Sequence, residues 1–217
     1  EGSFAWLRRK VDRETEQAVR ALNLKGIDFV PETKRAYPLK SVAANLIGFT
    51  DIDGKGVEGL EQQLQETIAG KPGWVKAEVD ALGRIIPGTT YERVEAVDGH
   101  SVILTIDARI QHLAETAIAK AQATYQAAGV SAVVLDPRTG EILALANRPT
   151  YDPNMPAKSE TASRRNRCVT DLYEPGSTLK AITVAAALEE GVIRPTSLFH
   201  CAGSYPIGKQ QIRCVVH

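Results

Sequence analysis

Residues 131–147 read SAVVLDPRTGEILALAN, and this stretch decides the fold of the second half of the chain. Two apolar runs flank residues 136–140, whose Asp, Pro and Gly are typical of a tight turn, so the stretch predicts a β-hairpin. Before it, apolar side chains recur at helical spacing from Ile110 to Ala121, and Asp107 stands where a helix N-cap is expected. The helix and the hairpin together indicate an antiparallel sheet packed with helices.

A long polar loop and an apolar helix follow the hairpin. Residues 149–167 are rich in Pro, Asn and Arg, whereas residues 177–191 read STLKAITVAAALEEG and predict a helix that ends at Gly191. Residues 101–106, SVILTI, are expected to add a strand. These elements predict a sandwich in which the 177–191 helix is buried against the sheet.

The first part of the chain, residues 1–99, is mixed and rich in turns. An amphipathic stretch at residues 4–26 predicts one helix, and residues 60–69 predict a shorter one. Four extended runs predict short strands, at residues 27–30, 46–50, 74–80 and 89–97. The predicted fold class is therefore α+β, with a small mixed domain at residues 1–99 and a second domain at residues 100–217.

The composition excludes several classes of protein. The 217 residues are 43% hydrophobic and 24% charged, and 26 Lys and Arg balance 26 Asp and Glu, so no excess charge attracts nucleic acid or anionic lipid. No apolar run is long enough to span a bilayer. The chain starts with Glu1 rather than Met and stops at His217 after a hydrophobic and basic stretch, so we expect it to be part of a longer protein.

Three cysteines are too few for a disulfide scaffold. His200, Cys201, Cys214 and His217 form an H-C-x12-C-x2-H pattern, whose thiolates and imidazoles could bind Zn²⁺. Adjacent His200 and Cys201 would however point to opposite faces of a strand, and no C-x2-C knuckle is present. We expect no metal, and we favour a facing pair of Cys201 and Cys214 in a hairpin over unrelated buried thiols.

Residues 54–59, GKGVEG, match the G-x-G-x-x-G pattern of dinucleotide-binding turns. Asp51, Asp53 and Glu58 would crowd a pyrophosphate with negative charge, and the helix expected after the glycines is short. We therefore interpret the glycines as turn residues and expect no cofactor.

Ser177 and Lys180 give the strongest chemical signal, an S-x-x-K motif at the start of the apolar helix. Because three residues are nearly one helical turn, their side chains share a face. A serine hydroxyl becomes a good nucleophile when a base takes its proton, and a lysine can do so once burial has lowered its pKa. The pair therefore fits acyl transfer through a serine ester, and a capping serine beside an exposed lysine is the structural alternative.

Longer stretches resemble the class B penicillin-binding proteins, most closely the septal, division-specific peptidoglycan transpeptidases. The matching pieces stand in the family's order: RAYP from 35, AANLIGFTDIDGKGVEGLEQQL from 43, GRII from 83, LTIDARIQHLAE from 104, AVVLDPRTGEILALANRPTYDPN from 132 and RNRCVTDLYEPGSTLK from 165. The resemblance implies a non-catalytic pedestal at residues 1–99 and the N-terminal portion of a penicillin-binding, serine β-lactamase-like transpeptidase domain at residues 100–217.

The resemblance also implies roles, partners and location. Ser177 is expected to form an acyl-enzyme with the D-Ala-D-Ala end of a peptidoglycan stem peptide or with a β-lactam, Lys180 to act as general base, and the Ser177 N–H to be an oxyanion donor. Other expected partners are membrane-bound cell-division or cell-wall synthesis proteins, and not nucleic acid. The parent protein is expected outside the cytoplasm, held at the inner membrane by an N-terminal helix that this chain lacks.

Two motifs of the family are missing. The chain has no S-x-N and no K-[ST]-G, and Arg138-Thr139-Gly140 is better interpreted as the hairpin turn. We therefore expect the 217 residues alone to be inactive and their 177–191 helix to expose apolar faces unless another chain covers it. A β-lactam sensor or β-lactamase and a non-catalytic division-complex module are the alternative functions. The basic cluster at residues 164–167 is expected to be structural rather than a stem-peptide contact.

Overall fold

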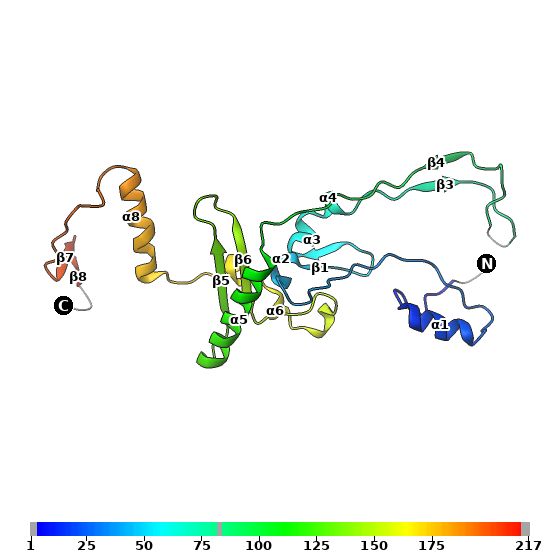
Figure 1. The fold of residues 1–217 in the computed structure, drawn as a ribbon, viewed down its shortest axis with the longest axis horizontal. Coiled ribbons are helices and arrows are strands. Elements are labelled where there is room, and N and C mark those ends of the chain that lie inside the picture. Colours follow the sequence, from blue (N-terminus) through cyan, green and yellow to red (C-terminus); the bar gives the residue numbers. More distant parts are fainter. Residues whose placement is uncertain (1–3, 82–83, 214–217) are drawn as a thin grey trace. The chain divides into compact units, whose positions relative to one another are not determined.

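The chain consists of helices and small antiparallel sheets. The computed structural model describes residues 4–81 and 84–213, and the chain divides into two compact units, Glu1–Asp171 and Leu172–His217. Figure 1 follows the elements along the chain, from blue at the N-terminus to red at the C-terminus. Four two-stranded sheets alternate with helices in the described part of the chain. This mixture confirms the predicted α+β class.

The first helix, α1 (Arg13–Ala21), is shorter than the amphipathic stretch predicted it to be. It begins after Asp12, whose carboxylate accepts the Thr15 N–H at 2.8 Å. It ends where the Leu22 N–H and the Asn23 N–H turn back to Val19 and Arg20 carbonyls. The strand predicted at residues 27–30 is wrong, because these residues form no strand in the described chain.

The next elements form a tight cluster around a small core: α2 (Ala44–Ile47), β1 (Phe49–Thr50), β2 (Gly56–Glu58), α3 (Gly59–Gln63) and α4 (Gln65–Ile68). The strand predicted at 46–50 is correct only at its end, because Leu46 and Ile47 complete α2. The helix predicted at 60–69 is interrupted at Leu64. Ala44, Phe49 and Tyr151 make the hydrophobic core of this cluster.

Of the three glycines of residues 54–59, Gly54 lies in the predicted turn, whereas Gly56 begins β2 and Gly59 begins α3. Gly54 and Gly59 have φ angles of +81° and +62°. A Cβ on Gly59 would lie 2.6 Å from the Leu46 carbonyl oxygen and 2.6 Å from the Gly48 nitrogen. The glycine is needed here because two backbone segments cross in contact.

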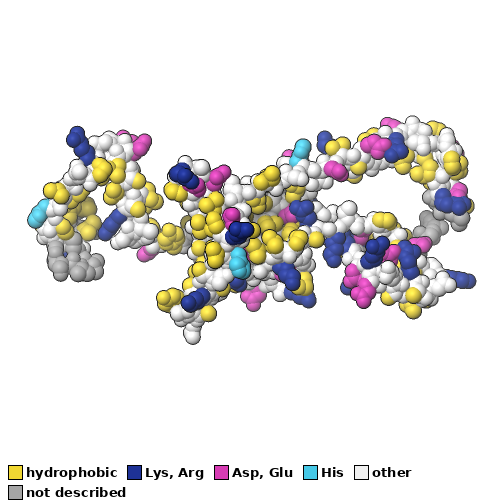
Figure 2. Space-filling view, viewed as in Figure 1, with side chains coloured by type: hydrophobic (Ala, Val, Ile, Leu, Met, Phe, Trp, Pro, Cys, Tyr) yellow, Lys and Arg dark blue, Asp and Glu magenta, His cyan; other side chains and the backbone are white. Residues whose placement is uncertain are grey.

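A two-stranded arm follows, made of β3 (Trp74–Lys76) and β4 (Glu92–Val94). The pairing Trp74↔Val94 is antiparallel, and the bridges Lys71↔Val97 and Val79↔Ile85 extend it on both sides. The two runs predicted as strands therefore pair with each other, although over fewer residues than expected. Hydrophobic side chains of the arm lie on its surface (Figure 2).

The best-packed part of the first unit is α5 (Ala108–Tyr125) against the hairpin of β5 (Val130–Leu135) and β6 (Ile142–Arg148). The Asp107 carboxylate caps α5 by accepting the N–H groups of Arg109 and Ile110 at 2.8 and 3.0 Å. The hairpin is confirmed, with Val133 opposite Leu145.

The strand predicted at residues 101–106 is wrong. Within the described chain these residues reach β6 only at their end, where the Thr105 hydroxyl donates to the Ile142 carbonyl at 2.7 Å and the Asp107 N–H to the Leu143 carbonyl at 2.9 Å. Ile103 is 95% exposed. A strand needs a hydrogen-bonded partner along its length. In the part of the chain that the structure describes, the sheet that residues 101–106 were expected to join consists of β5 and β6 alone.

The loop after β6 contains η1 (Pro156–Lys158), α6 (Thr161–Arg164) and α7 (Arg167–Thr170). Its arginines are structural, as expected: Arg164 pairs with Glu58 at 3.2 Å, Arg167 pairs with Asp171 at 2.8 Å, and Arg165 also bonds to Asp171. One of these pairs joins the loop to β2, across the boundary expected at residues 99 and 100. The assignment of residues 1–99 and 100–217 to two domains stays a prediction.

The second unit contains η2 (Gly176–Thr178), α8 (Leu179–Glu189) and the hairpin of β7 (Ser204–Ile207) and β8 (Gln210–Arg213). Gly191, with φ +66°, follows the end of α8 as predicted. None of the residues of α8 is buried, which confirms the expected exposure of its apolar faces. Its packing against the sheet stays a prediction, because that sheet belongs to the first unit. Cys214 and His217 lie outside the described residues, so the pairing of Cys201 with Cys214 stays a prediction.

Candidate active site

Ser177 and Lys180 lie in one continuous helical run. Ser177 is the second residue of η2 and Lys180 is the second residue of α8, which starts directly after η2. Gly176 enters this run with φ +52°, a conformation that glycine adopts without strain. Residues three apart on a helix lie on one face, so the structure keeps the spacing on which the motif depends.

The turn that starts α8 is closed by Thr178 and not by Ser177. The Thr178 N–H donates to the Pro175 carbonyl at 3.0 Å, and the Thr178 hydroxyl donates to the same oxygen. No side chain caps α8, and in the described chain no hydrogen bond involves the Ser177 hydroxyl. The structure therefore argues against the capping alternative, because the hydroxyl remains available to react.

Lys180 does not have the buried surroundings that the sequence predicted. Its side chain is exposed, and its apolar neighbours Leu179 and Ile182 are 49% and 68% exposed. Burial is what disfavours the charged form of an ammonium group, and the described residues do not provide it around Lys180. The 217 residues hold the two side chains of the motif in register but do not bury the lysine.

A buried polar network on α5 is a feature that the sequence analysis missed. The predicted apolar stripe includes Leu113, which is 68% exposed, whereas Gln111, Glu115 and Ile118 form the buried face. The Gln111 amide accepts the Leu145 N–H at 2.8 Å and donates to the Leu145 carbonyl at 3.0 Å. The i, i+4, i+7 spacing of these three residues was the available signal, but the polarity of Gln111 and Glu115 hid it.

The same network reaches the segment before α2. Glu115 Oε1 accepts the Gln111 amide and the Ala43 N–H, each at 2.8 Å. Asn45 of α2 donates to the carbonyls of Ser163 and Arg165 at 2.7 and 3.1 Å. The first-half segment at residues 43–45 is therefore held by hydrogen bonds to α5 and to the loop that follows β6.

Cys168 lies in this packed region and has no sign of a reactive thiol. It is half-buried, and its sulfur lies 3.6 Å from the Ala146 carbonyl oxygen and 3.6 Å from Asn147 Oδ1. Burial raises the pKa of the thiol, which keeps it protonated at neutral pH. Across residues 4–81 and 84–213 no three His, Cys, Asp or Glu side chains are grouped to bind a metal ion, and no helix is long and apolar enough to cross a membrane.

Comparisons with known proteins agree with the two halves of the chain. Residues 4–104 match the family model of the penicillin-binding protein dimerisation domain, and residues 130–215 match that of the penicillin-binding protein transpeptidase domain. The second match includes Ser177 and Lys180. Both matches stand in the order that the sequence resemblance implied.

Individual relatives cover most of this chain. A probable peptidoglycan D,D-transpeptidase PenA of Neisseria gonorrhoeae is 46% identical over 87% of the chain, and the peptidoglycan D,D-transpeptidase FtsI of Escherichia coli K12 is 37% identical over 99%. The crystal structure of penicillin-binding protein 3 from Mycobacterium tuberculosis complexed with aztreonam has a TM-score of 0.67 and 33% identity over 84% of this chain and 37% of its own. The chain spans about a third of the curated relatives, 33% of PenA and 36% of FtsI.

Proposed function

This chain belongs to the penicillin-binding proteins, and from that premise we propose that it carries the nucleophile of a peptidoglycan D,D-transpeptidase of septal cell-wall synthesis. The observation that supports the proposal most strongly is the unbonded hydroxyl of Ser177. Its hydroxyl makes no hydrogen bond in the described chain, and Lys180 follows one helical turn later within the region matched to the transpeptidase domain.

The proposed reaction is acyl transfer in two steps. Ser177 Oγ attacks the carbonyl carbon of the penultimate D-Ala of a stem peptide while Lys180 accepts the hydroxyl proton, and the terminal D-Ala leaves as its amine takes up a proton. An amine of a second stem peptide then attacks the ester and restores the Ser177 hydroxyl. The Ser177 N–H lies in the first turn, where helix N–H groups have no intrahelical acceptor, and suits an oxyanion donor.

β-Lactams are proposed to acylate the same oxygen. The strained ring amide takes the place of the D-Ala-D-Ala bond, and its leaving nitrogen stays attached to the acyl group. The complex of the Mycobacterium tuberculosis relative with aztreonam supports this part of the proposal.

These 217 residues lack two motifs and the burial of α8 that the proposed reaction needs. The sequence has no S-x-N and no K-[ST]-G motif, and α8 and Lys180 are exposed. We expect the segments that carry those motifs in the whole protein to cover α8 and to bury Lys180, since burial disfavours the charged form of a lysine. Loss of one oxyanion donor alone costs about 3 to 4 kcal/mol in related acyl transfers, so the 217 residues alone are expected to be inactive.

Residues 1–99 are proposed to be the non-catalytic pedestal and residues 100–217 the N-terminal portion of the transpeptidase domain. The pedestal would position the catalytic domain and contact membrane-bound cell-division or cell-wall synthesis proteins. We also propose that the protein acts outside the cytoplasm, anchored to the inner membrane. The match of residues 4–104 to the dimerisation domain supports the assignment.

Fluorescent penicillin tests the function directly. The product of the complete gene should acquire one covalent label that resists denaturation, and the label should disappear in Ser177→Ala but not in Ser101→Ala, which changes an exposed serine outside the motif. Slow loss of the label over hours supports a transpeptidase, whereas loss within minutes indicates a β-lactamase. Labelling that persists in Ser177→Ala contradicts the proposal.

A further inference from the structure

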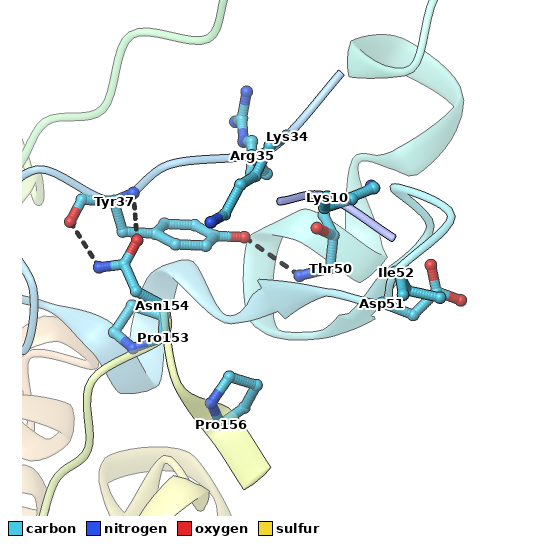
Figure 3. A pocket seen from close by; sticks show the side chains of 10 residues that line it. All are labelled: Lys10, Lys34, Arg35, Tyr37, Thr50, Asp51, Ile52, Pro153, Asn154 and Pro156. Carbon is cyan, nitrogen blue, oxygen red and sulfur yellow. Dashed lines mark hydrogen bonds between the residues drawn. The ribbon is translucent and has the colours of Figure 1, made fainter. Parts of the chain in front are cut away.

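A basic pocket lies on the first unit, where segments far apart in the sequence meet (Figure 3). Its volume is about 220 Å³. Six of the residues that line it define the basic pocket: Lys10, Lys34, Arg35, Tyr37, Thr50 and Asn154.

Hydrogen bonds hold the polar wall of the basic pocket in place. The Tyr37 hydroxyl accepts the Thr50 N–H at 3.1 Å. The Asn154 side chain pairs with the Tyr37 backbone, since its oxygen accepts the Tyr37 N–H at 3.0 Å and its amide donates to the Tyr37 carbonyl at 2.9 Å. Burial raises the pKa of Tyr37, and the nearby Glu61 carboxylate, with which its hydroxyl interacts, acts in the same direction.

Two of the three cations of the basic pocket have no ion-pair partner. The Arg35 guanidinium bonds to the buried Glu61 carboxylate at 2.7 Å. Among the residues that the structure describes, no carboxylate forms an ion pair with Lys10 or Lys34, although Glu32 and Asp12 lie near enough to feel their charges. In Figure 3 the ammonium end of Lys34 lies beside the Tyr37 ring, whereas Arg35 turns away from that ring.

The one carboxylate in the lining is already used by its own loop. Asp51 Oδ1 accepts the N–H groups of Asp53 and Lys55, each at 2.9 Å. The basic pocket therefore presents two ammonium groups that have no ion-pair partner among the described residues, which is an arrangement for an anion.

We propose that the basic pocket binds the phosphate group of a small ligand, with Lys10 and Lys34 as its donors. A planar carboxylate is matched best by the fork of an arginine, and that of Arg35 is occupied by Glu61. Lysines act as point charges and suit a tetrahedral phosphate. The volume lies below the roughly 300 to 1,000 Å³ of sites for drug-sized molecules, so the pocket accommodates the phosphate and little more.

This inference does not depend on the transpeptidase assignment, because the basic pocket contains neither Ser177 nor Lys180. Its ligand would touch residues 34–37 and the loop at residues 153–156 at the same time. Binding would therefore stabilise the contact between residues 34–37 and the loop that follows β6.

Titration with inorganic pyrophosphate, followed by calorimetry and by amide chemical shifts of the 217-residue chain, tests the proposal. We expect saturable binding at one site, with the largest shifts at Thr50 and Asn154. Lys10→Gln and Lys34→Gln should each weaken binding about tenfold, since a charge-assisted hydrogen bond of ordinary strength corresponds to that factor. Lys120→Gln, which removes an exposed lysine of α5, should leave binding unchanged. Thermal midpoints without ligand should be the same for all four chains, which excludes misfolding as the cause.

Two further ligands identify the source of the phosphate and the class of anion. Vesicles containing phosphatidic acid, compared with phosphatidylcholine vesicles, distinguish a lipid headgroup from a soluble phosphate. Acetate at equal concentration should not compete. Equal weakening by Lys120→Gln, competition by acetate, or no saturable binding of pyrophosphate and phosphatidic acid vesicles would overturn the proposal.

Discussion

Replacement of Gln111 by methionine should destabilise the first unit by more than the loss of one exposed hydrogen bond would. Gln111 is fully buried, and its amide makes both hydrogen bonds to the Leu145 backbone and a third to Glu115. Met has a similar length and volume, so it fills the space without a cavity but provides no donor or acceptor that replaces the amide. The substitution isolates the hydrogen bonds from the packing.

The expected cost follows from the groups left behind. A buried backbone group that loses its partner costs about 1 to 3 kcal/mol, and Gln111→Met leaves the Leu145 N–H and carbonyl without theirs, so we expect a loss of about 2 to 5 kcal/mol. Total stabilities of domains are about 5 to 15 kcal/mol, so a loss of this size is readily measured.

Urea unfolding of the 217-residue chain measures this loss, and hydrogen exchange at the Leu145 amide locates it. Gln122→Met is the matched control, because Gln122 is on the same helix, is only partly buried and makes one long bond of 3.4 Å to the Ala127 carbonyl. The control should change the free energy of unfolding by about 0.5 kcal/mol or less. Equal effects of the two substitutions, or unchanged protection of the Leu145 amide in Gln111→Met, would refute the argument.

Three further predictions concern the cap of α5, the crossing at Gly59 and the thiol of Cys168. Asp107→Ala should lower the thermal midpoint. Because N–H bonds hold the pKa of the Asp107 carboxyl below its usual value, the cap stabilises the chain above about pH 4, and this stabilisation is lost as the pH falls through the lowered pKa. The difference in thermal midpoint between Asp107→Ala and the unmodified chain should therefore shrink in acid. A constant difference down to pH 2 would argue against the cap. Gly59→Ala should cost more in urea unfolding than Gly54→Ala, since both glycines have positive φ but only a Cβ on Gly59 meets backbone, and equal costs would show that the crossing relaxes. Cys168 should react with iodoacetamide much more slowly in the native chain at pH 7.5 than in urea, because burial raises its pKa and limits access; equal rates would contradict the burial.

The sequence predicted best those elements whose causes are local. The hairpin of β5 and β6 followed from its turn residues, the start of α5 from Asp107 and the end of α8 from Gly191. Each depends on the backbone conformation of a few consecutive residues, and the residue types at those positions favour that conformation directly.

Elements whose causes are distant could not be predicted in the same way. Residues 101–106 have the composition of a strand, yet a strand exists only with a partner, and their composition does not name one. Gln111 and Glu115 were missed because hydropathy counts them as surface residues, whereas the Leu145 and Ala43 backbone groups make them interior ones.

The candidate site shows the same division. The spacing of Ser177 and Lys180 was readable, and the structure adds that Thr178 closes the turn and leaves the Ser177 hydroxyl unbonded. The burial of Lys180 was expected from the apolar character of its helix. That expectation fails in these 217 residues because a helix is buried only by what packs on it.

Intact mass spectrometry of the complete gene product after incubation with a β-lactam tests the central claim most directly. We predict a gain of one β-lactam mass, with the adduct on the peptide that contains Ser177 and no gain for Ser177→Ala. An adduct on a different residue, or an unchanged mass under conditions in which the Escherichia coli relative is acylated, would contradict it.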